Sequence, residues 1–224
     1  MKSGLALFYV MSLGVASAAK AQSSSTYVPC LKDISRQESR SKELAAIVQR
    51  DQDDRVNWSS MTPREWAEVL KRDEDRRRRV GEIFGEGCFK TAEDYGAAAL
   101  VYQHGEVPDH FFQTFIWAKR AVELGDATQN SLIAKAIDRY LINKGQKQLF
   151  GTQVDRPGAT EATCWCLAQT EPTFSDRIRK VYSAKIRSEV FAWLKELNQG
   201  KTCPNSECSK PLKPSPKGTV PGFW

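Results

Sequence analysis

The sequence is poor in histidine and lacks the short motifs that identify common enzymes. Its only histidines are His104 and His110, and they form no His-Glu-x-x-His zinc motif. The chain also has no Gly-x-Ser-x-Gly nucleophile turn and no phosphate-binding loop. Motifs therefore exclude the common zinc proteases, α/β-hydrolases and P-loop enzymes, and they indicate neither a metal ion nor a cofactor.

Long apolar segments are also scarce. One apolar run, from Gly4 to Val15, follows the basic Lys2 and leads to the small-residue sequence Ala19-Lys20-Ala21. This run is too short for a membrane anchor, which needs about 20 apolar residues. The order of these features is typical of a cleavable secretory signal, so we expect residues 1–21 to be removed. The mature protein is then expected to be secreted or periplasmic, and no later run predicts a membrane span.

A strong excess of one charge is absent once the signal is removed. The full chain has a net charge of +6, and the signal carries Lys2 and Lys20 but no acidic residue, which leaves +4. The basic run Arg76 to Arg79 lies about one helical turn from the acidic stretch Asp73 to Asp75, so the two are expected to neutralise each other on a solvated helix face. The sequence therefore predicts no nucleic-acid partner.

Six cysteines follow the predicted signal: Cys30, Cys88, Cys164, Cys166, Cys203 and Cys208. An even number in an exported chain favours disulfides. Cys164 and Cys166 are too close in sequence to pair comfortably with each other, whereas Cys203 and Cys208 can close a small loop and are the predicted local pair. A zinc site built from these four cysteines is the alternative, although their spacings are unusual for zinc.

Apolar residues recur at intervals of three and four from Glu38 to Leu197, which predicts an all-α fold of antiparallel helical hairpins. The predicted helices span residues 39–58, 62–84, 91–103, 109–125, 128–144 and 175–197. A loop from 146 to 172 carries two cysteines, and loops of this length inside compact domains are often functional. Residues 22–37 form an N-terminal segment, 38–200 the helical domain, and 201–224 a tail rich in Lys and Pro that is expected to be disordered.

A short motif is repeated in the first two predicted helices, because residues 50–55 and 72–77 both fit Arg-Asp-x-Asp-x-Arg. Helical spacing places one Asp and one Arg of each copy on an apolar stripe: Asp51, Arg55, Asp73 and Arg77. Buried charges are costly unless they are paired. We therefore expect an antiparallel helix pair in which these four side chains either form a structural ion-pair network or hold a ligand.

A further set of polar residues resembles the signature of an uncharacterised bacterial domain family marked by QH, DR and GTQ motifs. The residues that carry the resemblance are Asp51, Arg55, Gln103, His104, Gln113, Gly125, Asp138, Arg139, Gly145, Gln148, Gly151, Thr152 and Gln153. The chain departs from the family pattern at Cys88-Phe89-Lys90, where Trp-Pro is more usual, and at Phe150, where Tyr is common. The resemblance implies a shared fold but no reaction.

The segment from Ala97 to Gly125 resembles the helical hairpins of the tetratricopeptide superfamily, with small residues on one helix and a glycine turn. Such hairpins usually bind other proteins, and this resemblance implies similar packing here. Stacked arrays normally need about three repeats for stability, and this chain offers a single hairpin. The resemblance therefore favours a scaffold or interaction role rather than a repeat array.

The polar signature predicts one pocket lined by Gln103, His104, Asp138, Arg139 and the loop 151–153. The alternative is that Asp138 and Arg139 are simply exposed, because adjacent residues on a helix point about 100° apart. The sequence favours an exported binding or interaction domain that takes an unknown polar or anionic ligand or a protein partner. The alternative is a hydrolase in which His104 or Asp138 acts as acid or base.

Overall fold

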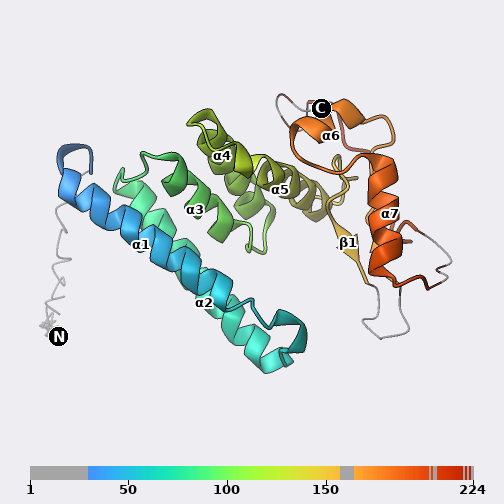
Figure 1. Ribbon diagram of the computed structural model, residues 1–224, viewed down its shortest axis with the longest axis horizontal. Coiled ribbons are helices and arrows are strands. Elements are labelled where there is room, and N and C mark those ends of the chain that lie inside the picture. The colour runs from blue at the N-terminus through green and yellow to red at the C-terminus, as the bar shows by residue number, and fades with distance from the viewer. Residues whose placement is uncertain are drawn as a thin grey trace, which may run out of the picture.

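A computed structural model describes residues 30–156, 164–201, 203, 206–218, 220 and 222. The described chain is mainly helical, which confirms the all-α prediction (Figure 1). The predicted signal, residues 1–21, lies outside this part of the chain. Within the described residues, no helix is both long enough and apolar enough to cross a membrane.

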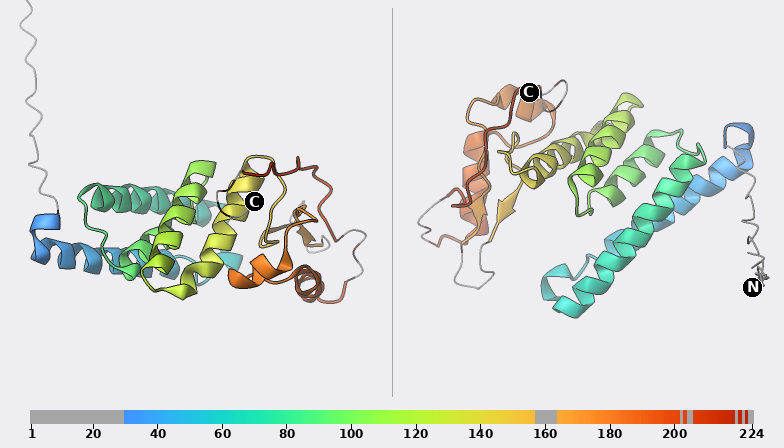
Figure 2. Two further views of the ribbon diagram at one scale, coloured as in Figure 1. Left: turned by 90° about the horizontal axis from the view of Figure 1, so that it is seen from above. Right: turned by 180° about the vertical axis from the view of Figure 1, so that it is seen from behind.

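The helices follow one another along the length of the molecule. Their bounds are α1 (Ile34–Asp53), α2 (Pro63–Gly85), α3 (Ala92–Tyr102), α4 (Pro108–Glu123), α5 (Asn130–Asn143), α6 (Asp176–Val181) and α7 (Arg187–Leu197). Short 3-10 turns are η1 (Cys30–Lys32), η2 (Trp58–Ser60) and η3 (Ala127–Gln129). Figures 1 and 2 show the α1–α2 hairpin and the α6–α7 pair at opposite ends, with α3 to α5 between them.

Local capping signals determine where the early helices begin. Thr62 and Thr91 are the N-caps of α2 and α3, and each forms a capping box with the acidic residue three positions later. In contrast, α1 begins at Ile34 rather than near residue 39, because the Asp33 carboxylate accepts the backbone N–H of Arg36 at 3.0 Å. The helical region therefore starts inside the segment that was expected to precede it.

The helices α1 and α2 run antiparallel, as predicted. Arg40 near the start of α1 pairs with Glu86 after the end of α2 at 2.6 Å, and Asp54 after the end of α1 pairs with Arg72 in the middle of α2 at 2.8 Å. Between these ion pairs, both helices contribute to the main core through Leu44, Ile47, Val80 and Ile83. The hairpin is thus held by a buried apolar side and by charges along its length.

The middle helices α3, α4 and α5 pack against one another. Their contact sides carry small side chains that are fully buried: Ala98, Ala99, Ala118, Ala134 and Ala136. Larger rings fill the space at the α2 side of this layer, where the Trp117 ring lies 4.6 Å from that of Tyr102 and 5.4 Å from that of Phe89. The resemblance of this segment to tetratricopeptide hairpins stays a prediction.

The prediction of one continuous helix over residues 175–197 is wrong, because the chain forms two helices, α6 and α7, with a turn between them. Ser183 adopts a left-handed φ of 53° there. The N–H of Ala184 then donates to the carbonyl of Arg179 at 2.9 Å, which closes the end of α6. Glycine usually occupies the left-handed position at the end of a helix, so a serine at this position does not indicate in the sequence that the helix ends.

The tail beyond residue 200 was expected to be disordered, and this is wrong for its described residues. The N–H of Lys213 donates to Gly145 at 2.9 Å, and its carbonyl accepts from Lys147 at 2.8 Å. Cys208 likewise donates to the carbonyl of Leu167 at 2.8 Å. Backbone hydrogen bonds hold this segment in place. The prediction of disorder relied on the low content of apolar residues, which does not indicate whether the backbone is hydrogen-bonded.

The long loop also contains a two-stranded antiparallel ribbon of β1 (Val154–Asp155) and β2 (Cys166–Leu167). The tail runs beside β2, which places Cys208 against Cys166 and Cys203 against Cys164, with Cα separations of 5.0 and 6.0 Å. These distances suit disulfides. The predicted Cys203–Cys208 bridge is therefore wrong, and so is the four-cysteine zinc alternative, since all four sulfurs are in bridges to other residues.

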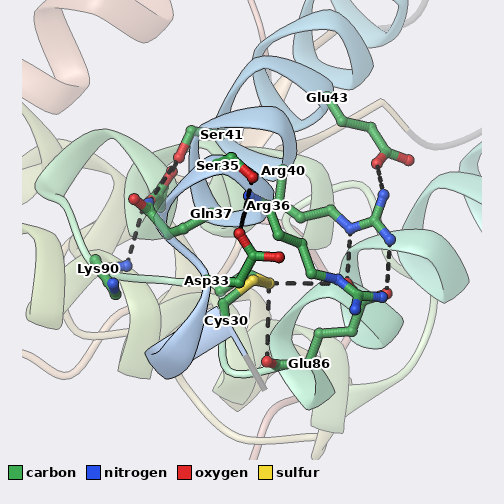
Figure 3. Close-up of a disulfide and its surroundings, with 12 residues drawn as sticks. Cys30, Asp33, Ser35, Arg36, Gln37, Arg40, Ser41, Glu43, Glu86 and Lys90 are labelled. Carbon is green, nitrogen blue, oxygen red and sulfur yellow. Dashed lines mark hydrogen bonds and ion pairs between the residues drawn. A yellow bond between two sulfur atoms is a disulfide. The ribbon is translucent and has the colours of Figure 1, made fainter. Parts of the chain in front are cut away.

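A third disulfide, Cys30–Cys88, ties the start of α1 to the segment after α2, and both cysteines are fully buried. Figure 3 shows Glu86 beside this bridge, with Arg36 and Arg40 directed at its carboxylate. The backbone N–H of Cys30 also donates to the carbonyl of Glu86 at 2.9 Å. The open end of the α1–α2 hairpin is thus closed by one covalent bond and several polar contacts.

Candidate functional site

Two buried aspartates on facing helices form the centre of the α1–α2 ion cluster, which comprises Asp51, Asp54, Arg55, Asp73 and Arg76. Arg55 donates to Asp51 at 3.0 Å and to Asp73 at 2.5 Å. Arg76 donates to Asp73 at 2.8 Å and also pairs with Asp54. Asp51 and Asp73 are 0% and 1% exposed, so these guanidiniums compensate the loss of their hydration. The predicted pairing of Asp51, Arg55 and Asp73 is confirmed.

Arg76 belongs to this cluster, although the sequence predicted it on a solvated face. Only 8% of it is exposed. The prediction is wrong because Arg76 lies on the side of α2 that packs against α1. The apolar residues of α2 mark only part of that side, so their spacing does not indicate that a charged residue beside them is buried. Arg78, in contrast, is exposed and pairs with Asp75 at 2.5 Å, as expected for a solvated face.

His104 connects the ion cluster to the end of α3. Its Nδ1 lies 3.0 Å from Oδ1 of Asp51, and its backbone carbonyl accepts from Nη1 of Arg77 at 2.9 Å. Arg77 therefore joins the network through His104 rather than through a carboxylate. A histidine held by a buried aspartate through Nδ1 presents its other nitrogen, Nε2, for proton transfer or hydrogen bonding.

Two arginines converge on the carbonyl end of α3. Arg77 reaches the carbonyl of His104, and Nη1 of Arg139 reaches the carbonyl of Gln103 at 2.5 Å. The last carbonyls of a helix carry partial negative charge, so cations there are stabilised. This contact positions Gln103 through its backbone, whereas the sequence had suggested a role for its side chain.

The carboxylate of Asp138 on α5 holds the start of the long loop. It is fully buried, and its oxygens accept from the N–H groups of Leu149, Phe150 and Thr152 and from the Thr152 hydroxyl. Burial raises the pKa of the Asp138 carboxyl, and these hydrogen bonds oppose that rise. Because both oxygens are fully occupied by the loop, Asp138 acts as an internal anchor and not as an accessible acid or base.

Gln148 is the second anchor of this loop. Its side-chain amide donates to the carbonyls of Gln153 and Ala168 at 2.9 and 2.7 Å and accepts from the N–H of Gln153 at 2.9 Å. The side chain is fully buried. Gln148 thus connects the loop to the segment after β2, and it presents no atom to a ligand.

Arg139 and Gln153 lie together in a cleft between the C-terminal half of α5, the β ribbon and the tail, which we call the α5 cleft. Its volume is about 190 Å³. The polar lining consists of Arg139, Asn143, Gln153, Asp155 and Lys210, and the apolar lining includes Ile142, Val154 and Leu212. The cleft combines two cations with one exposed carboxylate and an apolar wall.

The guanidinium of Arg139 is the most informative group in the α5 cleft. Its Nε donates to Oε1 of Gln153 at 3.2 Å and its Nη1 to Gln103, whereas Nη2 has no acceptor among the described residues. No carboxylate of the described chain lies within ion-pair distance of it. Burial, and next the nearby charge of Arg55, lower the pKa of Arg139, although an arginine remains protonated at neutral pH. The cleft therefore contains a desolvated cation with an unused donor.

The residues predicted for one pocket are thus distributed over several places. Arg139 and Gln153 share the α5 cleft, whereas His104 lies at the ion cluster. Gly151 and Thr152 line a separate cavity on the other side of the loop. Gln113 lies on α4, away from the lining of the α5 cleft.

Sequence reasoning missed the residues that the tail brings to the α5 cleft, Lys210 and Leu212. No local pattern identifies them, because their position depends on backbone pairing between the tail and the loop. The comparisons add no assignment: the chain matches no protein-family model, no curated protein and no solved structure.

Proposed function

We propose that this protein is an exported binding domain that takes a small anionic ligand in the α5 cleft. The observation that carries the proposal is Arg139, a largely buried guanidinium without a carboxylate partner among the described residues. Guanidinium groups bind carboxylates and phosphates through pairs of parallel N–H donors. Export is supported by the three disulfides, which persist in oxidising compartments.

The surroundings of Arg139 favour an anion over a neutral ligand. Lys210 adds a second positive charge to the lining, so two cations outweigh the one carboxylate, Asp155, and amide groups nearby can orient a polar ligand. Burial and the charge of Arg55 both disfavour the charged form of Arg139, and an anion bound at Nη2 relieves both penalties. Ile142, Val154 and Leu212 provide apolar contact for the remainder of a small molecule.

Thermal unfolding in the presence of small anions tests this proposal. A ligand that binds only the native state stabilises it by about 2.7 kcal/mol at a concentration of 100 times its Kd. We expect acetate, phosphate or sulfate to raise the melting temperature at constant ionic strength, with chloride as the reference salt. Arg139→Gln should abolish the rise, and Lys210→Gln, an exposed position, should reduce it without affecting the fold.

The matched control is Arg177→Gln, which removes an exposed arginine of α6 outside the α5 cleft. This variant should retain the full response to anions. An equal response in all variants would show nonspecific salt binding and reject the proposal, as would the absence of any anion effect beyond that of chloride.

The hydrolase alternative rests on one observation, the contact between His104 Nδ1 and Asp51 Oδ1 at 3.0 Å. This arrangement suits a general base whose Nε2 accepts a proton from water. Asp138 is not a candidate because the loop occupies both of its oxygens. Hydrolysis of activated esters or peptides that is lost in His104→Gln but retained in Arg139→Gln would favour the hydrolase over the binding domain.

A further inference from the structure

A second cavity lies on the other side of the loop that Asp138 holds. Its volume is about 220 Å³. The apolar lining consists of Ala134 of α5, Phe150 and Gly151 of the loop, and Ala184 and Trp193 of the α6–α7 region. Ala184 and Trp193 provide its accessible surface, because the other three are buried. It shares no lining residue with the α5 cleft, so the two cavities form separate sites.

The break between α6 and α7 creates this cavity. The turn at Ser183 ends α6 and brings Ser183, Ala184 and Lys185 to the lining. Ser183 adopts its left-handed conformation, with φ at 53°, without the freedom of glycine. Unfavourable backbone conformations of this kind are concentrated at ligand sites and turns that surrounding structure holds in place.

The charged groups of this second cavity all have the same sign. Lys135 of α5 and Lys185 of the turn belong to its lining, and no acidic side chain does. Neither lysine forms an ion pair with another described residue, and both are exposed enough to move toward a ligand. An apolar interior with two free ammonium groups is complementary to a molecule with an apolar body and one negative end.

We propose that the cavity between α5, the Phe150–Thr152 loop and the α6–α7 turn binds an aliphatic or aromatic monocarboxylate, with the carboxylate between Lys135 and Lys185. The ring or chain then lies against Ala184 and Trp193, the apolar lining residues that are partly exposed. The size agrees with this, since apolar cavities of about 150 Å³ accommodate a benzene molecule. This site is independent of the anion site proposed in the α5 cleft.

Binding of octanoate and phenylacetate to the protein, each compared with its neutral alcohol, tests this inference. The readout is the indole N–H resonance of Trp193, assigned by its loss in Trp193→Phe, together with calorimetric affinities. Both acids should shift this resonance and bind at least about tenfold more tightly than 1-octanol and 2-phenylethanol, because only the acids engage the ammonium groups.

Charge-removing variants locate the carboxylate. The double variant Lys135→Gln/Lys185→Gln should weaken binding of both acids about tenfold and leave the alcohols unchanged. The matched control Lys144→Gln/Lys195→Gln removes two exposed lysines of the same region that do not line the cavity. It should retain the affinity for the acids.

Three results would overturn the inference. The first is the absence of binding by either acid, and the second is equal affinity for acid and alcohol in the wild-type protein. The third is acid binding that Arg139→Gln abolishes and the lysine variant preserves, which would place the acid in the α5 cleft. Loss of the anion response in Arg139→Gln with acid binding retained distinguishes the two sites.

Discussion

The Asp138 carboxylate on α5 accepts two hydrogen bonds from Thr152, one from the backbone N–H and one from the hydroxyl, each 2.8 Å long. The loop residues on either side of this contact face different cavities: Phe150 to Thr152 line the second cavity, and Gln153 lines the α5 cleft. One buried carboxylate therefore fixes the wall between two candidate binding sites.

Replacement of Asp138 should destabilise the fold and both cavities together. Asp138→Ala leaves three backbone N–H groups unpaired near the core, and each unsatisfied buried donor costs about 1–3 kcal/mol. We expect a loss of at least about 3 kcal/mol in urea unfolding. Asp155→Ala, at an exposed position of β1, is the control and should change stability by less than about 0.5 kcal/mol.

The α1–α2 ion cluster predicts that replacing either of two nearby aspartates of α2 lowers the stability of the fold by very different amounts. Asp73→Ala removes the partner of two mostly buried guanidiniums and should cost about 3–5 kcal/mol. Asp75→Ala removes only the exposed pair with Arg78 and should cost less than about 1 kcal/mol. Chemical denaturation of both variants measures the difference, and similar small losses would mean that solvent reaches the cluster.

Asp54 predicts a specific dependence of stability on pH. The hydrogen bond from Arg72, with a further contribution from Arg76, lowers the pKa of Asp54 from 3.8 to about 2. A carboxyl whose pKa is lower in the folded state stabilises the fold above its unfolded pKa, and this stabilisation is lost as the pH falls from about 4 to about 2. With allowance for partial exposure, it amounts to about 1–2 kcal/mol at neutral pH.

Urea unfolding of the wild-type protein and Asp54→Asn between pH 7 and pH 2 measures this effect. The stability difference should be constant above about pH 5 and be mostly lost near pH 2. Asp53→Asn, which alters a neighbouring carboxylate bonded to Gln49, serves as the control and should change stability little. A difference that persists unchanged at pH 2 would contradict the role assigned to Asp54.

The disulfide pattern makes a prediction that a digest can check. Trypsin places Cys164 and Cys166 on one peptide and Cys203 and Cys208 on another, so the structure predicts one crosslinked pair of peptides. A Cys203–Cys208 bridge would instead leave the second peptide internally closed. Mass spectrometry before and after reduction separates the two results.

Double variants resolve which cysteines are joined. Cys166→Ser/Cys208→Ser removes one bridge with a sequence separation of 42 and should cost up to about 4 kcal/mol by loop entropy. Cys166→Ser/Cys203→Ser removes one member of each bridge and should cost more, because both crosslinks are lost. Equal stabilities would indicate a different connectivity.

Local signals in the sequence predicted the helices, and charge placement predicted part of the site. The helix start at Thr62 and the four-residue spacings from Asp51 to Arg55 and from Asp73 to Arg77 depend on residues within one or two turns, so they can be recognised in the chain itself. The Asp51 and Asp73 carboxylates meet their partners because an antiparallel hairpin brings the two copies of one motif together.

The C-terminal part could not be predicted in the same way. The positions of Lys210 and Leu212 depend on backbone pairing between the tail and residues far away in the sequence, such as Gly145. The buried Arg179 gives no apolar signal, yet it donates to the carbonyl of Leu149 at 2.7 Å and helps to hold the loop. Contacts of this kind leave no periodic pattern.

The turn at Ser183 allows a test in which a substitution should increase stability. A left-handed conformation costs an L-residue about 1–2 kcal/mol, and glycine avoids this cost. Part of the gain in stability is offset because glycine has more conformational entropy in the unfolded chain. Ser183→Gly should therefore raise stability by about 1 kcal/mol, equivalent to a few degrees in melting temperature for a chain of this size. Ala192→Gly in the exposed interior of α7 is the control and should lower stability by about 1 kcal/mol. If Ser183→Gly lowers stability instead, a contact of the serine side chain outweighs the backbone cost, and the turn beside Lys185 is held by that contact.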